Sequence, residues 1–503
     1  MPEASAPATV AVIDIGSNSG RVVVYRYQAG GHLQLLAGSR ATLRLVRELD
    51  ETHRLSEEAV ARAFEAIADF RAIARGTGAT RIAAVATAAV RDASNGAAFI
   101  TRLRKELELD VRILSGEEEA RYGFLGGVGG LPVEHGALFD VGGGSMQVSR
   151  FRQRKLATSV SLPLGSLRLS DAFLKSDPPS KREIRRLRDH VRELLEEAGV
   201  ARLERGEELV GTGGTVRNLA KVDRHARRAY PITRLHGYSL SHRRLADVVE
   251  EVVSTRLKKR EQIAGLNDDR GDSIAGGGLA IDTLMGVLEA PELVVSGQGV
   301  REGLAASLVT DTLPGPAAVR ESSLAALAAR FDGWVEEPAR RRTALARTLV
   351  DTLELKPDPE VREALLQAAR LLDIGRSVDF FERHEHVADL VLATDLNGFT
   401  HRGVALLSAV LRQAGHEDAD PRFYAPLLDE KDRPAIARAG ALLVLADDIE
   451  ERCPDGVPIE VECRVRKDDV LVTVPVLLAW RPRTVGKRFA KAFGRQLVVK
   501  AGA

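Results

Sequence analysis

Apolar and polar positions alternate along residues 9–27, TVAVIDIGSNSGRVVVYRY, and a Gly/Ser/Asn turn interrupts the alternation after Asp14. This pattern predicts two antiparallel strands joined by a tight turn. Residues 56–75 instead place apolar side chains at helical spacing behind a serine cap and two glutamates, which predicts a helix. Residues 82–95 and 110–128 each predict a strand followed by a helix.

The strand and glycine-turn pattern starts again at residues 136–152, GALFDVGGGSMQVSRFR. The segments DIGSNSGR (14–21) and DVGGGSMQ (140–147) both place an aspartate at the end of an apolar strand, which suggests an internal duplication. Residues 208–222 and 292–308 each read as strand, glycine turn and helix. This repetition predicts a mixed α/β fold with ligand-binding loops at the ends of strands.

The pattern changes after residue 316. Residues 317–415 are rich in Ala, Leu, Arg and Glu at helical spacing, which predicts a separate helical domain. From about residue 457 to 500 the chain returns to strand patterns, and two alternating runs flank RKDD as in a hairpin.

Composition limits the class of protein. The chain has 503 residues, enough for two to four domains, and only two cysteines, which are not in a disulfide or zinc pattern. The N-terminus has no signal-peptide pattern, and no uncharged run reaches the roughly 20 residues of a membrane helix. We therefore expect a cytoplasmic protein without a membrane partner.

Net charge is +1, so overall charge predicts no specific nucleic-acid partner. Residues 481–500 nevertheless carry seven positive charges and no acidic residue, and residues 223–236 form a second basic cluster. Such clusters can hold phosphate chains, although a solvated surface is the ordinary alternative.

Glycine-rich turns after apolar strands have a specific chemical use. Consecutive glycines let backbone amides approach an anion, and a following helix adds its dipole. An aspartate at the strand end can hold Mg²⁺ directly or through water. One such turn is weak evidence, because a hairpin turn explains it equally well. Four such turns in one chain indicate a phosphate-binding cleft between two halves.

Eight stretches carry a more specific resemblance, in the order AVIDIGSNSGRVVVY, VATAAVRDASN, ILSGEEEARYGFLG, LFDVGGGSMQVSR, SLPLGSLRL, LVGTGGTVRNLAK, RGDSIAGGGLAID and VVSGQGVREGL. On these the chain resembles the long form of the exopolyphosphatase/guanosine pentaphosphate phosphohydrolase (Ppx/GppA) family, within the actin-like ATPase superfold. The resemblance covers residues 9 to about 308.

The resemblance implies an α/β fold class with two actin-like (ribonuclease H-like) domains around a cleft, at 1–128 and 129–310. It also implies a mainly helical HD-like domain at 311–450 and a strand-rich basic segment at 451–503. The implied activity is metal-dependent removal of a terminal phosphate.

Site residues follow from the same resemblance. Glu119 is the implied base, Arg91 holds the substrate phosphate, and Asp140 is the third implied catalytic residue. Asp14, Asp140 and Gln147 are the expected metal ligands. The expected phosphate-binding residues are Gly16, Ser17, Asn18, Ser19, Gly142, Gly143, Gly144, Ser145, Gly213, Gly214 and Thr215. From spacing alone, Glu119 would be a first-turn helix acid and Arg91 a surface ion-pair partner.

The chain departs from the family pattern at two places. Gln147 stands where the family has glutamate, and an amide keeps the shape but carries no charge and cannot act as a base. In LLDIG, Leu372 stands where an HD pair would have histidine, and His384, His386 and His401 have no recognised metal spacing. We expect a structural helical domain with a degenerate metal site.

Three functions stay open at this stage. The first is an exopolyphosphatase acting on inorganic polyphosphate, which the basic tail favours. The second is a guanosine pentaphosphate phosphohydrolase, and the third is a non-catalytic binder of polyphosphate or of guanosine penta- or tetraphosphate. The implied cofactor is Mg²⁺ or Mn²⁺, with K⁺ a further candidate, and a homodimer is expected by analogy.

Overall fold

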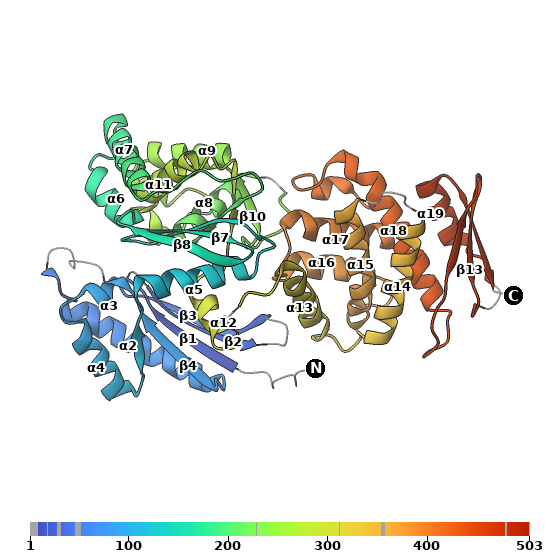
Figure 1. Cartoon of the computed structure of the whole chain (residues 1–503), viewed down its shortest axis with the longest axis horizontal. Coiled ribbons are helices and arrows are strands. Elements are labelled where there is room, and N and C mark those ends of the chain that lie inside the picture. The colour runs from blue at the N-terminus through green and yellow to red at the C-terminus, as the bar shows by residue number, and fades with distance from the viewer. Residues whose placement is uncertain are drawn as a thin grey trace. The chain divides into compact units, whose positions relative to one another are not determined.

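The computed structural model describes residues 9–17, 19–27, 32–45, 52–227, 229–310, 312–353, 358–477 and 480–501 (Figure 1). The chain forms two compact units. The first comprises Met1–Arg228 and Leu235–Ser322, and the second comprises Ala229–Arg234 and Ser323–Ala503.

The first sheet of the first unit has the strand order β3-β2-β1-β4-β5. Its strands are β1 (Thr9–Ile15), β2 (Ser19–Tyr27), β3 (Leu33–Thr42), β4 (Arg81–Ala86) and β5 (Val111–Ile113). Strands β1 and β2 pair antiparallel, which confirms the predicted hairpin, and β1, β4 and β5 run parallel. Ile13 and Val22 lie opposite each other and bury one face of the sheet against helix α2 (Glu57–Gly76) and helix α4 (Gly96–Leu107).

Local sequence signals explain where the helices of this sheet begin. Ser56 caps α2 by accepting a hydrogen bond from Ala59 N, as the serine before the apolar run predicts. Ser115 and Glu118 form a capping box at the start of α5 (Gly116–Gly129). The short helix α3 (Ala88–Asp92) follows β4 directly. The turn of ILSGEEEAR is therefore a helix start, and its three glutamates lie in the first turn of α5.

The second sheet has the order β10-β11-β9-β6-β7-β8. Its strands are β6 (Gly136–Val141), β7 (Met146–Arg152), β8 (Lys155–Leu162), β9 (Glu208–Thr212), β10 (Tyr238–Ser241) and β11 (Glu292–Val295). Its helices are α6 (Ser166–Phe173), α7 (Lys181–Glu197), α8 (Gly213–Ala226), α9 (His242–Ser254), α10 (Leu257–Arg260), η1 (Asp268–Arg270) and α11 (Ile274–Val287). Helix α11 is buried almost throughout, which explains its glycines and apolar residues.

Helices α5 and α12 (Val300–Ser307) join the two sheets (Figure 1). They approach so closely that a Cβ on Gly126 would lie 1.8 Å from Gly299 O, and one on Gly303 would lie 1.9 Å from Tyr122 O. One core runs from Val12 of the first sheet through these helices to Leu138 of the second. The first unit is thus a two-lobed α/β fold, which confirms the expected fold class.

The second unit is mainly helical, as predicted from residue 317 onward. The chain passes from the first unit into the second within α13 (Pro316–Ala328). The elements that follow are α14 (Glu336–Leu353), α15 (Pro359–Leu371), η2 (Leu372–Ser377), α16 (Arg383–Ala393), α17 (His401–Gly415), η3 (Pro421–Tyr424), η4 (Glu430–Asp432) and α18 (Arg433–Glu450). Where the HD-type pair would lie, Leu372 is buried and Asp373 forms ion pairs with Arg342, Arg376 and Arg383.

The three histidines considered above as metal ligands have different surroundings. His401 Nδ1 lies 2.8 Å from the Tyr230 hydroxyl. Burial lowers the pKa of His384 to about 4, and His386 lies half-buried on α16. In the part of the chain that the structure describes, no group of three or more His, Cys, Asp or Glu side chains is placed to hold a metal ion.

The C-terminal segment is a three-stranded sheet with one helix. Strands β12 (Glu462–Val465) and β13 (Asp469–Val474) pair antiparallel around RKDD, which confirms the predicted hairpin. The expectation of strands up to residue 500 is wrong over Arg483–Phe493, which forms helix α19. Val485 and Phe489, four residues apart, are buried there, and β14 (Gln496–Ala501) then pairs parallel to β13, which requires a crossover connection.

No helix among the described residues is both long and apolar enough to cross a lipid bilayer.

Candidate active site

A cleft of about 560 Å³ lies within the first unit and is lined by strand ends and glycine turns of both sheets. Of the expected phosphate-binding residues it brings together Gly16, Ser17, Ser19, Gly142, Gly143, Gly144, Ser145, Gly213 and Gly214. Asn18 lies outside the described residues. Thr215 is buried and donates to Val141 O at 3.4 Å, so its side chain does not line the cleft.

Strand pairing explains why these turns meet. The turn after β6 closes on itself, because Gly142 N donates to Ser145 O at 2.9 Å. Strands β6 and β9 run parallel, so the turn that begins with Gly213 lies beside Asp140. Gly213 has a φ of +93°, and a Cβ there would lie 2.3 Å from Asp140 Oδ1. Glycine is therefore required both by the backbone and by the nearby carboxylate.

Asp14 ends β1 and carries an ion pair that the sequence did not reveal. Arg301 Nη1 donates to Asp14 Oδ2 at 3.2 Å, and the two side chains are only 16% and 15% exposed. Burial raises the pKa of Asp14, and Arg301 opposes that shift. The first aspartate of the cleft is thus already neutralised by a residue of the chain.

Asp140 ends β6 and differs from Asp14 in its surroundings. Burial raises its pKa, while the charges of Arg217 and Arg301 lower it. Among the described residues, Asp140 has no side-chain hydrogen bond and no ion pair, although it lines the cleft. Gln147 lies directly opposite it in the β6–β7 ladder and also lines the cleft. A desolvated carboxylate without a partner is a place where a cation would bind.

These residues fit Mg²⁺ or Mn²⁺ in one particular way. Mg²⁺ commonly takes one or two carboxylates from the protein and completes its shell with phosphate oxygens and water. Asp140 offers the free carboxylate, and the Gln147 amide offers a neutral oxygen beside it. The cleft therefore fits a cation held jointly by the protein and a bound phosphate, rather than by a complete cage of protein ligands.

Glu119 and Arg91 both line the cleft and lie beside each other. Glu119 lies in the first turn of α5, and its Oε2 is 3.5 Å from Arg91 Nη1. Arg91 Nη1 also donates to Leu114 O at 2.9 Å, which fixes the guanidinium. Burial raises the pKa of Glu119 to about 7, with Asp140 and Asp14 adding to the rise and Arg91 opposing it. A carboxylate with this pKa can accept a proton near neutral pH.

Five arginines that sequence reasoning missed also line the cleft: Arg21, Arg168, Arg217, Arg270 and Arg301. With Arg91 they make six cations in the described lining, against the acids Asp14, Asp92, Glu119 and Asp140. Each of Arg21, Arg217 and Arg301 lies within a few residues of a glycine turn in the sequence. That proximity is the signal that could have found them.

The cleft arginines affect one another. Burial, followed by the charges of Arg301 and Arg217, lowers the pKa of Arg21 to about 10. Burial and the charge of Arg301 likewise lower the pKa of Arg217. These guanidiniums therefore repel one another at close range in a partly desolvated space. An entering polyanion would relieve this repulsion and accept charge-assisted hydrogen bonds.

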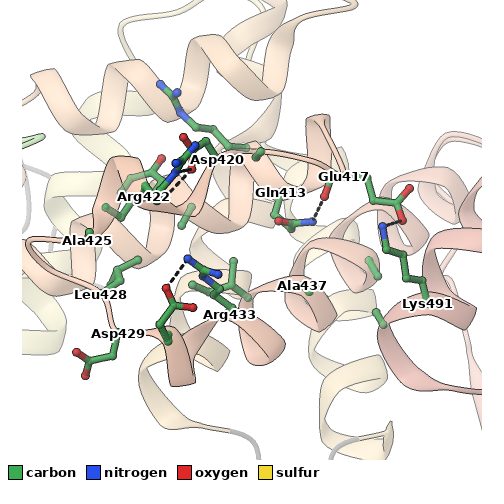
Figure 2. A pocket seen from close by; sticks show the side chains of 18 of the residues that line it. Gln413, Glu417, Asp420, Arg422, Ala425, Leu428, Asp429, Arg433, Ala437 and Lys491 are labelled. Atoms are coloured by element: carbon green, nitrogen blue, oxygen red, sulfur yellow. Dashed lines mark hydrogen bonds and ion pairs between the residues drawn. The ribbon is translucent and has the colours of Figure 1, made fainter.

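The second unit contains a cavity of its own, of about 350 Å³, between α17, α18 and α19 (Figure 2). Small apolar side chains form much of its wall, and charged side chains form its rim. The rim pairs are Arg433 with Glu430 at 2.5 Å, Arg422 with Asp420 at 3.1 Å, and Lys491 with Glu417 at 3.1 Å. The described lining holds five cations, which include Arg412 and Arg488, against four acids, so its positive excess is smaller than that of the cleft.

Comparisons with known proteins agree with this geometry. The profile of the Ppx/GppA phosphatase family matches residues 23–312, and that of Ppx/GppA phosphatase domain III matches residues 319–465. Exopolyphosphatase 1 of Mycobacterium tuberculosis is 30% identical over 338 residues, which cover 66% of this chain and 96% of the relative. Exopolyphosphatase 1 of Mycobacterium leprae is 29% identical over 315 residues, covering 62% and 92%.

Solved structures show the same fold. The crystal structure of the Aquifex aeolicus member of the Ppx/GppA family has a TM-score of 0.55 and 27% identity, covering 60% of this chain and 98% of that one. An exopolyphosphatase from Cytophaga hutchinsonii has a TM-score of 0.54 at 24% identity, covering 60% and 97%, and supports the fold alone. The family profile spans more than half of the sequence. The chain therefore belongs to the Ppx/GppA phosphatase family.

Proposed function

We propose that this protein is an exopolyphosphatase, which releases orthophosphate from the end of inorganic polyphosphate by attack of water. The observation that carries the proposal is the cleft itself, where glycine turns and an excess of arginines surround the carboxylates of Asp14 and Asp140. The arginines outnumber the acids of the cleft, and a chain of phosphates supplies the repeated negative charge that would pair with them. The names of the mycobacterial relatives support the same substrate.

In this mechanism Glu119 removes a proton from a water molecule that lies in line with the terminal phosphorus. The new P–O bond forms as the bond to the bridging oxygen breaks, and that oxygen leaves as the new chain end. The proton taken by Glu119 passes to solvent or product. Burial keeps the Glu119 carboxylate basic enough for this transfer, and Arg91 keeps it oriented.

The remaining cleft residues hold the substrate. Arg91 and the other arginines would bind the equatorial phosphate oxygens through planar, charge-assisted pairs. Backbone amides of the glycine turns, such as those of Gly143 and Gly213, would hold the terminal group. A Mg²⁺ ion bound by Asp140, with the oxygen of Gln147 beside it, would offset charge on the transferred group.

Two other functions are considered beside this one. A guanosine pentaphosphate phosphohydrolase would use the same turns and base on the 5′ phosphate chain. A non-catalytic binder would retain the arginines and lack turnover, because Gln147 supplies no negative charge. We favour hydrolysis, since Glu119 and Asp140 are both carboxylates and both lie in the cleft.

One panel of substrates tests the proposal. The purified full chain with Mg²⁺ would be offered long polyphosphate, short polyphosphate and guanosine pentaphosphate, and released orthophosphate would be measured. We expect release from long polyphosphate at the highest kcat/KM. Preference for the nucleotide would replace the proposed substrate, and binding without release from any of the three would overturn both hydrolase functions.

The pKa of Glu119 predicts a pH profile. Because the base must be ionised, kcat/KM should rise with pH through a pKa of about 7 and then level off. Replacing Arg91 with Met removes the charge that lowers this pKa, so the acid limb should move to higher pH. Profiles from about pH 5.5 to 9 for both proteins check the shift. An acid limb at the same pH in both would show that Glu119 is not the titrating base.

Gln147→Glu should lower the Mg²⁺ concentration needed for half-maximal activity by about tenfold, because it adds a negative charge beside Asp140. The measurement is a Mg²⁺ titration at saturating polyphosphate. Gln153→Glu is the matched control, since Gln153 lies on the exposed turn after β7 and adds the same charge away from the cleft. An unchanged Mg²⁺ requirement in Gln147→Glu would show that position 147 does not contact the cation.

A further inference from the structure

We infer that Arg301 neutralises Asp14 through a permanent ion pair. A divalent ion in the cleft is therefore bound by Asp140 and not by Asp14. The inference deepens the proposed function, because it concerns the cation that the hydrolysis would use. It also revises the expectation that both aspartates bind the metal.

The contact that carries the inference is short and enclosed. Arg301 Nη1 lies 3.2 Å from Asp14 Oδ2, and little of either side chain reaches solvent. A pair in such a place is weakly screened, so its attraction is far larger than that of a surface pair. A dication approaching Asp14 would have to displace the guanidinium and meet its positive charge.

Arg301 is held in this position from behind. It lies in the first turn of α12, next to Glu302. Glu302 Oε2 accepts from Gly299 N at 2.7 Å, which caps the helix, and Glu302 Oε1 accepts from the Tyr25 hydroxyl at 2.5 Å. Both Glu302 and Tyr25 are buried. The start of α12 is therefore fastened to β2, the strand paired with the one that carries Asp14, and Arg301 is directed into the cleft.

The two aspartates consequently offer different chemistry. Asp14 has a fixed partner, whereas Asp140 has no ion pair among the described residues and faces the cleft. Gln147, opposite Asp140 in the ladder, adds no charge of its own. Asp140 is thus the carboxylate that is available to a divalent ion. Asp14 is neutralised by Arg301 and does not need a second metal ion.

Binding of Mn²⁺ to the full chain with orthophosphate present, and without polyphosphate, tests the inference, because the cleft fits a cation held jointly by the protein and a phosphate. Free Mn²⁺ is measured by electron paramagnetic resonance. In the wild-type background, Asp140→Asn should abolish the cleft site, while Asp14→Asn should leave Mn²⁺ affinity within about twofold. Equal losses for the two variants would show that Asp14 is a metal ligand and would overturn the inference. This comparison does not need a variant of Arg301.

Removing the charge of Arg301 gives the complementary result. Arg301→Met should gain an additional Mn²⁺ ion or bind Mn²⁺ about tenfold more tightly, and Arg301→Lys should behave as the wild type. Arg301→Met/Asp14→Asn should lose the gain. Arg168→Met is the matched control, because it removes a cleft cation without freeing Asp14. No gain in Arg301→Met, a gain that persists in the double variant, or an equal gain in Arg168→Met would each overturn the inference.

The assay separates this inference from the proposed function. Mn²⁺ binding is read without polyphosphate and without turnover, so a protein that hydrolyses nothing can still show the predicted pattern. Conversely, hydrolysis of polyphosphate together with equal Mn²⁺ losses in Asp14→Asn and Asp140→Asn would uphold the function and reject the role of Arg301.

Discussion

Glu119→Gln should lower kcat for polyphosphate hydrolysis by about 10²- to 10⁴-fold, the range that a positioned general base contributes. The amide has nearly the same shape but cannot accept the proton from water. Binding should persist, because the arginines and glycine turns that hold the phosphates are unchanged. Single-turnover phosphate release gives the rate, and fluorescence anisotropy of labelled polyphosphate gives the affinity.

Glu117→Gln is the matched control for this substitution. Glu117 lies in the same first turn of α5 but is exposed and does not line the cleft, so kcat should stay within about twofold. Folding is checked by melting at about pH 8. Burial raises the pKa of Glu119 from 4.5 to about 7 in the folded chain, so the stability lost by ionising this carboxyl grows as the pH rises from about 4.5 and is complete above about 7. The melting temperature of Glu119→Gln should therefore be no lower than that of the wild type. Unchanged turnover in Glu119→Gln would show that Glu119 is not the base.

Arg342→Met should destabilise the second unit by about 3 kcal/mol, the lower end of the cost of breaking a buried ion pair. Arg342 is 0% exposed and lies 2.7 Å from Asp373, 2.7 Å from Asp447 and 3.7 Å from Glu450. Methionine fills much of the volume but leaves these carboxylates with less positive charge. The cost stays near the lower end because Arg383 and Arg341 still contact the same acids.

Urea unfolding followed by tryptophan fluorescence measures this effect. The only tryptophans in the sequence are Trp334 and Trp480, and both belong to the second unit, so the signal reports on that unit. Arg340→Met is the control, because Arg340 is 69% exposed and its pair with Glu337 should contribute less than about 1 kcal/mol. Equal midpoints for Arg342→Met and the wild type would show that the buried cluster does not hold this unit together.

The elements that sequence reasoning predicted correctly are those fixed by near neighbours. The β1–β2 and β6–β7 hairpins follow from alternation around a glycine turn, and the start of α5 follows from Ser115. These signals act over a few residues and survive folding. The four domain ranges proposed from sequence stay predictions.

The parts that sequence reasoning missed depend on distant partners. Arg301 and Asp14 are 287 residues apart in the sequence, and neither local pattern indicates that the two side chains form an ion pair. The resemblance implied Thr215 as a phosphate-binding residue, yet its side chain donates to Val141 O inside the protein. The strand pattern before residue 480 was extended to residue 500 and so missed helix α19, in which the buried Val485 and Phe489 lie four residues apart.

Gln147 has a more definite meaning once the cleft is described. Its place opposite Asp140 makes the loss of a charge local to one carboxylate, while Arg301 removes the other carboxylate from competition for a metal. The neutral Gln147 and the Arg301–Asp14 ion pair both reduce the negative charge available to bind a divalent ion in the cleft. Arginine then supplies more of the positive charge that a phosphate chain requires.

The most direct test of the account follows the products of one reaction. The wild-type chain would be incubated with Mg²⁺ and end-labelled long polyphosphate, with orthophosphate and residual chain length measured together. We predict orthophosphate from the earliest times while the remaining chains shorten from their ends, and no such release from Glu119→Gln. Chains cut internally without orthophosphate, or chains that stay intact although the protein binds them, would contradict the account.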